Sequence, residues 1–450
     1  MCGGSVVFGR KPCAQPLVYD PYITEPNIRI HGSGSEEYVG PRVDTCAAKR
    51  SFAIHCEYSL QETPAPPQIA ELNTTLRYMR QLFRKSKVHI EADCESHLHN
   101  QFSRILSDID MASTPGLCVL RNFGQTNREI FKPEIKDNRL VLDYDMVKCL
   151  YGLVSDRIDQ LLNDQDSADN IYVFVKPEPH KKSKVEEGRV RLIQAVSLVD
   201  TFIDRILLTL LFDEMKEHRF GTPLSVGWNC LTGTSTFFAQ SSGAETWLAT
   251  DVSHWDWSMK HWMITLIKNF FKEQVLAPPW WYKLLDRRFE MLFEKPTFEF
   301  KDGTTARQPV SGIMKSGCFM TLMMNSLGQV LCTHLAYSRA QLPIPFYKVM
   351  GDDIISAETE NNASLVVEEL ERLGLKIKAH TLVDPEFIGF ILNSKTYKYT
   401  PAYKAKHQWL LQRLTHDRDT AVSTLRSYQY LYANDQENLR VIRALAKQRG

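Results

Sequence analysis

Two short apolar runs in the second half of the chain flank the tripeptide Gly351-Asp352-Asp353. The runs, residues 346–350 and 354–357, have the length and the aromatic or β-branched content of strands. Glycine supplies the positive φ that a tight turn needs, so the sequence predicts a hairpin whose end carries two adjacent carboxylates. Because Asp and Gly also occur in purely structural turns, this hairpin alone does not indicate a function.

A second acidic segment has a similar setting. Residues 247–250 are predicted to form a strand that leads into Asp251, and Asp256 follows at the start of a helical pattern over 255–271. Carboxylates that converge without basic partners raise one another's pKa unless divalent cations hold them ionised. Oxygen ligands favour Mg²⁺ or Mn²⁺, so the pattern points to phosphoryl transfer assisted by two ions.

Residues 317–338 contain no Asp, Glu, Lys or Arg and are numerous enough to cross a bilayer. Thr321, Asn325, Gln329 and Thr333, however, recur every four residues and form one polar stripe on a helix. This favours a buried helix of a soluble protein, entered through Ser316 and Gly317. The polar stripe suits either recognition of a sugar hydroxyl or bonding to nearby backbone groups.

The total charge of +1 is an average over the whole chain, which contains two basic segments. Residues 176–191 carry six cations against three acids, which fits a solvated loop or a triphosphate-binding segment. Residues 395–450 hold 11 Lys and Arg against 4 Asp and Glu, interleaved with tyrosines. The net charge therefore does not exclude a polyanion as a partner.

In this order along the chain, the segments resemble the motifs of positive-strand viral RNA-dependent RNA polymerases, most closely those of the sobemovirus, polerovirus and barnavirus lineage. Residues 176–193 resemble motif F, 250–259 motif A, 316–325 motif B and 351–353 motif C. Weaker resemblances place motif G at 113–116, motif D at 370–378 and motif E at 387–390. Together these segments cover roughly residues 113–410.

The resemblance implies an α+β right-hand fold of fingers, palm and thumb, with an antiparallel-sheet palm of RRM-like type. The proline-rich start of the chain predicts an extended, loop-rich arm. The implied divisions are an arm with fingertips at 1–68, fingers at 69–197, palm at 198–262, a fingers insertion at 263–310, palm again at 311–394 and a thumb at 395–450.

The resemblance also implies template-directed synthesis of RNA from NTPs, replicating a viral RNA genome, and it assigns residues to this reaction. Asp251 and Asp352 are expected to hold two Mg²⁺ or Mn²⁺ ions, with Asp353 assisting. The ribose 2′-hydroxyl is assigned to Asp256, Ser316 and Asn325, supported by Thr321. The triphosphate is assigned to Lys176, Lys184, Arg189 and Arg191, and which arginine dominates stays open. Lys378 is favoured as general acid over Lys376 and His380, and RNA contacts fall on Ser113, Thr114, Gly116 and Gly317.

The implied partners are template RNA, nascent RNA and NTPs. Initiation de novo and from a viral protein primer both stay open, and membrane-anchored replication proteins in the host cytoplasm are expected. The start Met-Cys-Gly-Gly indicates neither a secretory signal nor an N-myristoylation site, and no transmembrane span is expected. Widely spaced cysteines predict reduced thiols.

Two alternative functions share parts of this pattern. A reverse transcriptase shares the two-metal palm, but it is expected to carry a small or aromatic residue near position 256 and an aromatic one before the paired aspartates. Asp256 and Gly351 favour ribonucleotides instead. A non-catalytic RNA-binding or capsid protein accounts for the basic segments but leaves the four aspartates unexplained.

Overall fold

The computed structural model describes residues 6–8, 18–34, 37–136, 139–241 and 243–449. Its central sheet has four strands in the order β13-β14-β9-β15, and every neighbouring pair is antiparallel. The strands are Tyr347–Met350, Asp353–Ala357, Trp247–Val252 and Ile377–Leu382. Met350 pairs with Asp353, so Gly351, at a φ of 65°, and Asp352 alone make the turn. The predicted hairpin is therefore confirmed.

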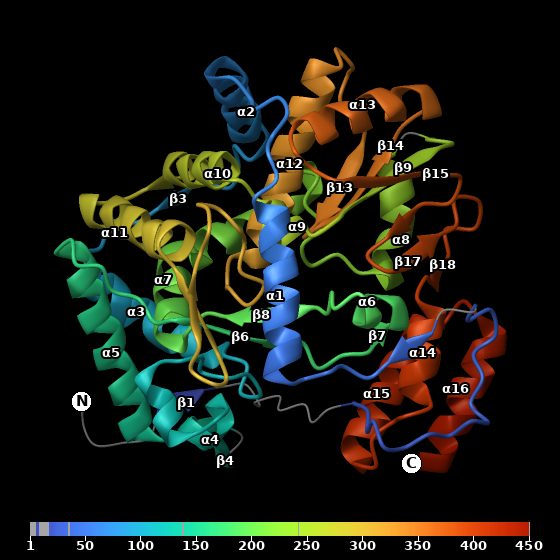
Figure 1. The fold of residues 1–450 in the computed structure, drawn as a ribbon, viewed down its shortest axis with the longest axis horizontal. Coiled ribbons are helices and arrows are strands. Elements are labelled where there is room, and N and C mark those ends of the chain that lie inside the picture. Colours follow the sequence, from blue (N-terminus) through green and yellow to red (C-terminus); the bar gives the residue numbers. More distant parts are fainter. Residues whose placement is uncertain (1–5, 9–17, 35–36, 137–138, 242, 450) are drawn as a thin grey trace.

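Helix α12 (Thr321–Arg339) precedes β13, and α13 (Glu360–Arg372) connects β14 to β15; the two helices pack against each other beside the sheet (Figure 1). Residues 323–337 of α12 are all buried. An uncharged helix suits this place, because a charge there would need a buried partner. The predicted buried helix is thus confirmed, and among the described helices none has the length and apolarity required of a membrane span.

A second sheet, β12-β11-β6-β8, lies below the first in Figure 1 and shares its main hydrophobic core. Its strands are Thr305–Arg307, Thr297–Phe300, Ile171–Val175 and Leu192–Ala195. Helix α1 (Thr45–Ser59) packs directly on β6, β8 and β11. The helices that pack against one another in the same core are α3 (Cys94–Ser107), α5 (Tyr144–Leu162), α7 (Leu198–Glu217), α11 (Pro279–Phe289) and the π-helical turn η3 (Glu290–Glu294).

The remaining elements between residues 6 and 276 are short or lie outside the two sheets. The helices among them are α2 (Ile69–Leu82), α4 (Asn127–Phe131), α6 (Lys182–Glu186), α8 (Cys230–Gln240), α9 (Trp255–Ser258), α10 (His261–Gln274), η1 (Val119–Phe123) and η2 (Arg219–Gly221). The strands are β1 (Val6–Phe8), β2 (Tyr38–Val39), β3 (Val88–His89), β4 (Glu134–Lys136), β5 (Arg139–Leu142), β7 (His180–Lys181) and β10 (Val275–Leu276).

Three local expectations need correction. The helix expected over 255–271 is broken into α9 and α10, because Lys260 leaves the helical path and bridges Gly312. Asp302-Gly303 predicts a two-residue hairpin turn after Phe298, but the turn has three residues, since the Phe300 N–H donates to Thr304 O. The loop-rich arm contains the 15-residue helix α1, capped by the Asp44 side chain.

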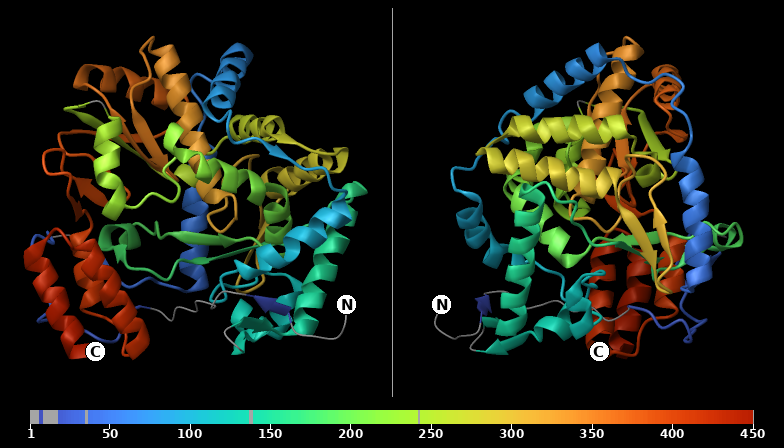
Figure 2. Two further views of the ribbon diagram at one scale, coloured as in Figure 1. Left: turned by 180° about the vertical axis from the view of Figure 1, so that it is seen from behind. Right: turned by 60° about the vertical axis from the view of Figure 1, so that its left-hand side comes forward.

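The C-terminal helices form a separate small core together with the N-terminal arm. They are α14 (Lys404–Leu411), α15 (Arg418–Leu431) and α16 (Gln436–Arg449), preceded by a sheet of β16 (Glu386–Phe387), β17 (Phe390–Leu392) and β18 (Tyr399–Pro401). Ile28 and Ile30 pack into the helical core, and the arm then continues into β2, which pairs with β7. Figure 2 shows these helices from behind, at the end of the molecule opposite α2.

The eight cysteines of the described residues are free thiols, as expected; Cys2 and Cys13 lie outside these residues.

Candidate active site

The central strand β9 places Asp251 between a residue of β14 and a residue of β15. Ile354 pairs with Thr250, so the next position along places Asp353 opposite Asp251. On the other side of β9, Lys378 pairs directly with Asp251. Residues opposite each other across antiparallel strands present their side chains on one face. The sheet therefore places a cation and two carboxylates side by side, with Asp352 at the adjoining turn.

The charges in this cluster act on one another. Desolvation by the surrounding protein, together with the negative charges of Asp352 and Asp251, raises the pKa of Asp353 to about 7. Among the described residues, no three His, Cys, Asp or Glu side chains stand close enough together to hold a metal ion as they are. The donor set nevertheless fits Mg²⁺ or Mn²⁺, because it consists of carboxylate oxygens whose mutual repulsion a divalent cation would relieve.

Asp256 lies behind this cluster and is joined to α12. The Asn325 side chain donates a 2.8 Å hydrogen bond from Nδ2 to Asp256 Oδ1. Burial raises the pKa of Asp256 to about 6, the Asn325 bond opposes this rise, and the charge of Asp352 adds to it. Asn325 Oδ1 is buried without a hydrogen-bond partner among the described residues. Asn325 Oδ1 can therefore accept a hydrogen bond from a ligand.

The polar stripe of α12 also supports the Asp352 turn, a role that the sequence analysis did not assign. Gln329 Nε2 donates to the Asp352 carbonyl at 2.8 Å, and the Gly351 N–H donates to Ser326 Oγ at 2.8 Å. Gln329 is 3% exposed. The four-residue recurrence of polar residues could have indicated Gln329. Ser326 is not part of that recurrence.

The basic segment 176–191 lies partly over the carboxylates and partly against the C-terminal helices. Desolvation, Arg189 and Arg191 lower the pKa of Lys184, while nearby Asp251 raises it. Arg189 is ion-paired with Glu187. The structure thus brings Lys184 toward the carboxylate cluster.

Glu178 joins the other cations of this segment to the C-terminal helices. Its carboxylate contacts Arg191 at 2.6 Å, Lys176 at 3.5 Å and Lys406 of α14 at 3.4 Å. Sequence reasoning missed Glu178 and Lys406, because they lie 228 positions apart.

Two predicted residues before α12 are anchored to β8. Ser316 Oγ donates to Leu192 O and accepts from the Gln194 N–H, both at 3.1 Å. A Cβ at Gly317 would come within 2.7 Å of Gln194 O, so only glycine fits this approach. The Ser316 hydroxyl is thus bonded to β8 and not to Asp256 or Asn325.

Thr321 begins α12 and is occupied by backbone contacts. Its hydroxyl donates to the carbonyl oxygens of Lys315, at 2.6 Å, and Cys318, at 2.8 Å. It therefore shapes the loop that leads into the helix.

The residues predicted at 113–116 form a turn away from the carboxylates. Ser113 Oγ donates to Asp110 O, and Arg121 donates to Thr114 Oγ1. Gly116 has a φ of 71°, and a Cβ there would lie 2.7 Å from Ser197 Cα at the start of α7. The structure assigns these groups to a local turn.

Two residues of the C-terminal part also approach the carboxylates, and the sequence analysis did not single out either as a site residue. The charge of Glu386, in β16, contributes to the raised pKa of Asp353. Burial, followed by Glu386, Asp353 and Asp251, raises the pKa of Tyr403. Tyr403 also packs against Gly389 in the turn between β16 and β17.

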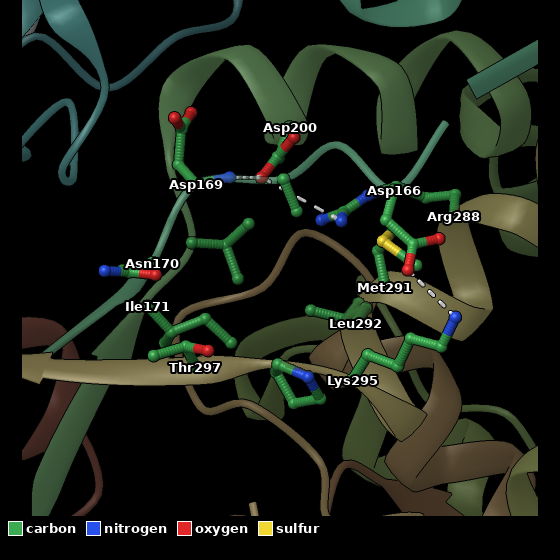
Figure 3. A pocket seen from close by; sticks show the side chains of 13 residues that line it. Asp166, Asp169, Asn170, Ile171, Asp200, Arg288, Met291, Leu292, Lys295 and Thr297 are labelled. Atoms are coloured by element: carbon green, nitrogen blue, oxygen red, sulfur yellow. Dashed lines mark hydrogen bonds and ion pairs between the residues drawn. The ribbon is translucent and has the colours of Figure 1, made fainter. Parts of the chain in front are cut away.

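A buried ionic network holds the loop before α12 from the other side. Arg288 Nε lies 2.6 Å from Asp204 Oδ1, and Cys318 Sγ lies 3.6 Å from Asp204 Oδ2. Burial alone would lower the pKa of Arg288, but Asp204 and Asp200 raise it. Figure 3 shows Asp200 and Arg288 reaching toward one another in an adjoining pocket of about 180 Å³.

Comparison with known proteins shows the family of this chain. The family model for viral RNA-dependent RNA polymerase matches residues 49–396. Protein P1-P2 of Potato leafroll virus is 27% identical over 343 residues, covering 62% of this chain and 30% of that protein. Replicase polyprotein P2AB of Cocksfoot mottle virus is 27% identical, covering 65% of this chain and 31% of the polyprotein.

A shorter relative is the RNA-directed RNA polymerase of Mushroom bacilliform virus, which is 27% identical over 51% of this chain and 56% of its own length. The chain thus spans about a third of the two longer relatives and about half of this one. The matched region contains every carboxylate of the cluster and both partners of the Asp256–Asn325 bond, and the chain belongs to the viral RNA-dependent RNA polymerase family.

Proposed function

We propose that the protein synthesises RNA on an RNA template from NTPs and thereby replicates a viral RNA genome. The observation that carries the proposal is the register of β9, which sets Asp251 opposite Lys378 and beside Asp353. Asp251 and Asp352, with Asp353 assisting, would hold two Mg²⁺ or Mn²⁺ ions. When bound, these ions supply the charge that activates an attacking hydroxyl and stabilises the phosphorus centre.

The other residues bind and orient the substrates. Lys184 and Arg189 attract the triphosphate toward the carboxylates, and Arg191 and Lys176 follow along the same segment. Asp256 and Asn325 accept and position the ribose 2′-hydroxyl, while Thr321 and Ser316 shape the loop beside them. Lys378, opposite Asp251, is placed to give a proton to the leaving pyrophosphate.

The fold suits a right hand. The connections β9–α12–β13 and β14–α13–β15, together with the strand order, support an RRM-like palm at 198–262 and 311–394. Residues 69–197 and 263–310 would form the fingers, 395–450 the thumb, and 1–68 an arm with fingertips. Ser113, Thr114, Gly116 and Gly317 would border the path of the template.

Partners and location follow from the same proposal. Template and nascent RNA are the macromolecular ligands, with a viral protein primer as one route of initiation. Replication proteins anchored in host membranes would bring the enzyme to cytoplasmic replication complexes. Co-sedimentation with those complexes tests this location.

The experiment that tests the function is extension of a primed RNA template with Mg²⁺ or Mn²⁺, supplied with NTPs or dNTPs. We expect NTP incorporation by the wild type and its loss in Asp352→Ala. Incorporation by Asp352→Ala at the wild-type rate would refute the assignment of the site. Preferred incorporation of dNTPs would favour a reverse transcriptase instead.

A further inference from the structure

Helix α2 carries a basic stripe on its exposed face. Arg77 and Arg80 lie three residues apart on one side of the helix. Arg84, in the turn after the helix ends at Leu82, and Lys87 continue the stripe, and all four side chains are exposed. None of these residues has a role in the catalytic site described above.

The opposite face of α2 fixes this stripe to the body of the protein. Thr75 Oγ1 lies 2.9 Å from His334 Nδ1 of α12, and the Tyr78 hydroxyl lies 3.2 Å from that of Tyr347 in β13. Met79 is fully buried. The stripe is therefore held on a rigid support, as a binding surface requires.

The stripe lines a pocket of about 520 Å³ together with the end of α10. Its lining has four cations and a single carboxylate, Glu273, which lies 3.1 Å from Arg80 Nε. Among the described residues, Arg84 and Lys87 form no ion pair. The pocket thus keeps an excess of positive charge that the protein does not neutralise.

A buried amide in the same pocket points to a ligand. Gln274, the last residue of α10, is 1% exposed, and neither its Nε2 nor its Oε1 has a hydrogen-bond partner among the described residues. Burying an amide without partners is unfavourable, and such groups in native structures call for an explanation. A bound molecule with both donor and acceptor oxygens would supply the missing bonds.

We propose that this pocket binds the backbone of single-stranded RNA outside the catalytic site. The arginine forks match phosphate oxygens, and a linear stripe follows successive phosphates. The Gln274 amide would bond a phosphate oxygen and a ribose hydroxyl. RNA is favoured over a membrane because helices that lie on membranes expose an apolar face. In α2 the apolar side chains after the first turn are partly or fully buried, and only Ile69 and Ala70 at its start are exposed.

The position of the pocket sets the length of RNA that can reach it. Asn325 lies near the catalytic end of α12, while His334, which contacts α2, lies nine residues further along this helix. That separation is roughly 13 Å along the helix axis. An RNA held only at the carboxylates would therefore not fill the pocket, whereas a longer one extending past the site would.

The test compares the wild type with Arg77→Ala/Arg84→Ala in fluorescence anisotropy, using a short and a longer single-stranded RNA over a range of salt concentrations. Metal ions and NTPs are omitted, so the result does not depend on catalysis. For the longer RNA we expect a several-fold weaker affinity and a salt slope reduced by roughly 1.4, about 0.7 for each lost phosphate contact. The short RNA should bind as it does to the wild type.

Lys148→Ala/Lys283→Ala is the matched control, because it removes two exposed cations from α5 and α11. An equal loss of affinity in this control would overturn the proposal, since the effect would then reflect overall charge. An unchanged salt slope in Arg77→Ala/Arg84→Ala would also overturn it. So would a loss of binding to phosphatidylserine vesicles with RNA binding intact, which would assign the pocket to a membrane.

Gln274→Met separates ligand binding from a structural role. The substitution keeps the side-chain length and removes the unpartnered amide, so the melting temperature should stay equal or rise. We expect weaker binding of the longer RNA by this folded variant. Wild-type affinity in Gln274→Met would exclude the amide from the site.

Discussion

Asn325 of α12 donates a hydrogen bond from its side-chain amide to the buried carboxyl of Asp256, joining α12 to the short helix α9. The two residues are 69 positions apart in the chain. Because they form one hydrogen-bonded unit, we expect their effects on sugar selection to overlap.

Replacing either member should therefore relax the choice of sugar. Asp256→Ala and Asn325→Ala are each expected to lower the preference for NTPs over dNTPs about tenfold or more, since a site that bonds a hydroxyl rejects its absence strongly. The double variant should lose little more than either single one. Steady-state incorporation of matched NTP and dNTP pairs measures this, and equal losses in sugar preference and RNA affinity would contradict the role.

Removing the support of the Asp352 turn should slow the reaction without weakening RNA binding. Gln329→Leu deletes the bond to the Asp352 carbonyl, and small misplacements of reacting groups cost up to about a hundredfold in rate. Thr333→Val is the control, one turn further along the same buried stripe. Single-turnover extension measures the rate, and a drop of the same size in both variants would argue against a specific effect on the turn.

The Arg288–Asp204 pair should matter for stability. Arg288→Met leaves buried carboxylates without their cation and is expected to cost about 3–5 kcal/mol of unfolding free energy. Adding Asp204→Leu should restore part of this loss. Urea denaturation measures both, with Lys295→Met at the rim of the adjoining pocket as a control of little effect. If the double variant regains no stability, the loss in Arg288→Met comes from packing and not from the unpaired carboxylates.

His55 should make the fold sensitive to acid. Burial first, then Arg189 and Lys184, lowers its pKa to about 4, and His254 stands 4.8 Å away from it, ring to ring. As the pH falls from about 6.5 toward 4, the unfolded chain binds a proton that the folded chain does not, so stability decreases.

At a pH below both pKa values, the lowered pKa of buried His55 reduces the free energy of unfolding by about 3 kcal/mol. His55→Gln should flatten the dependence of unfolding free energy on pH in this window, whereas exposed His261→Gln should not. Identical slopes for the wild type and His55→Gln would rule out this source of acid sensitivity.

Glu178 should hold the basic segment and the C-terminal helices together. Glu178→Gln removes the charge shared by Arg191, Lys176 and Lys406, so amide hydrogen exchange should increase in α14 and around β7. Glu187→Gln is the matched control, because its partner Arg189 lies in the same segment. Unchanged exchange in α14 of Glu178→Gln would contradict the link.

Local patterns in the sequence predicted the central elements of the site well. The Asp352 hairpin follows from turn chemistry, and α12 follows from a charge-free stretch with a four-residue polar period. Contacts between distant segments could not be predicted in this way. Met259 and Lys260 interrupt a helical pattern because Lys260 meets Gly312 in space, and Lys378 faces Asp251 only through the sheet register.

Some missed features did leave a local signal. The high proline content of the arm as a whole predicted loops and did not indicate helix α1. No proline occurs between Pro41 and Pro64, however, and Asp44 is a good capping residue. Ser316 bonds to β8 instead of Asn325, and a motif alone does not define which neighbour its hydroxyl meets. Its role in sugar recognition stays a prediction.

The joining of the arm to the C-terminal helices has a consequence for biosynthesis. Gln408 accepts from the Ile30 N–H, and Asn438 binds His31, so the two arm residues leave the ribosome 378 and 407 residues before these partners. Until then the arm has no partner in this core, and the nascent chain exposes Ile28 and Ile30 to chaperones and proteases. A chain whose synthesis stops before α14 would therefore lack the helices against which Ile28 and Ile30 pack.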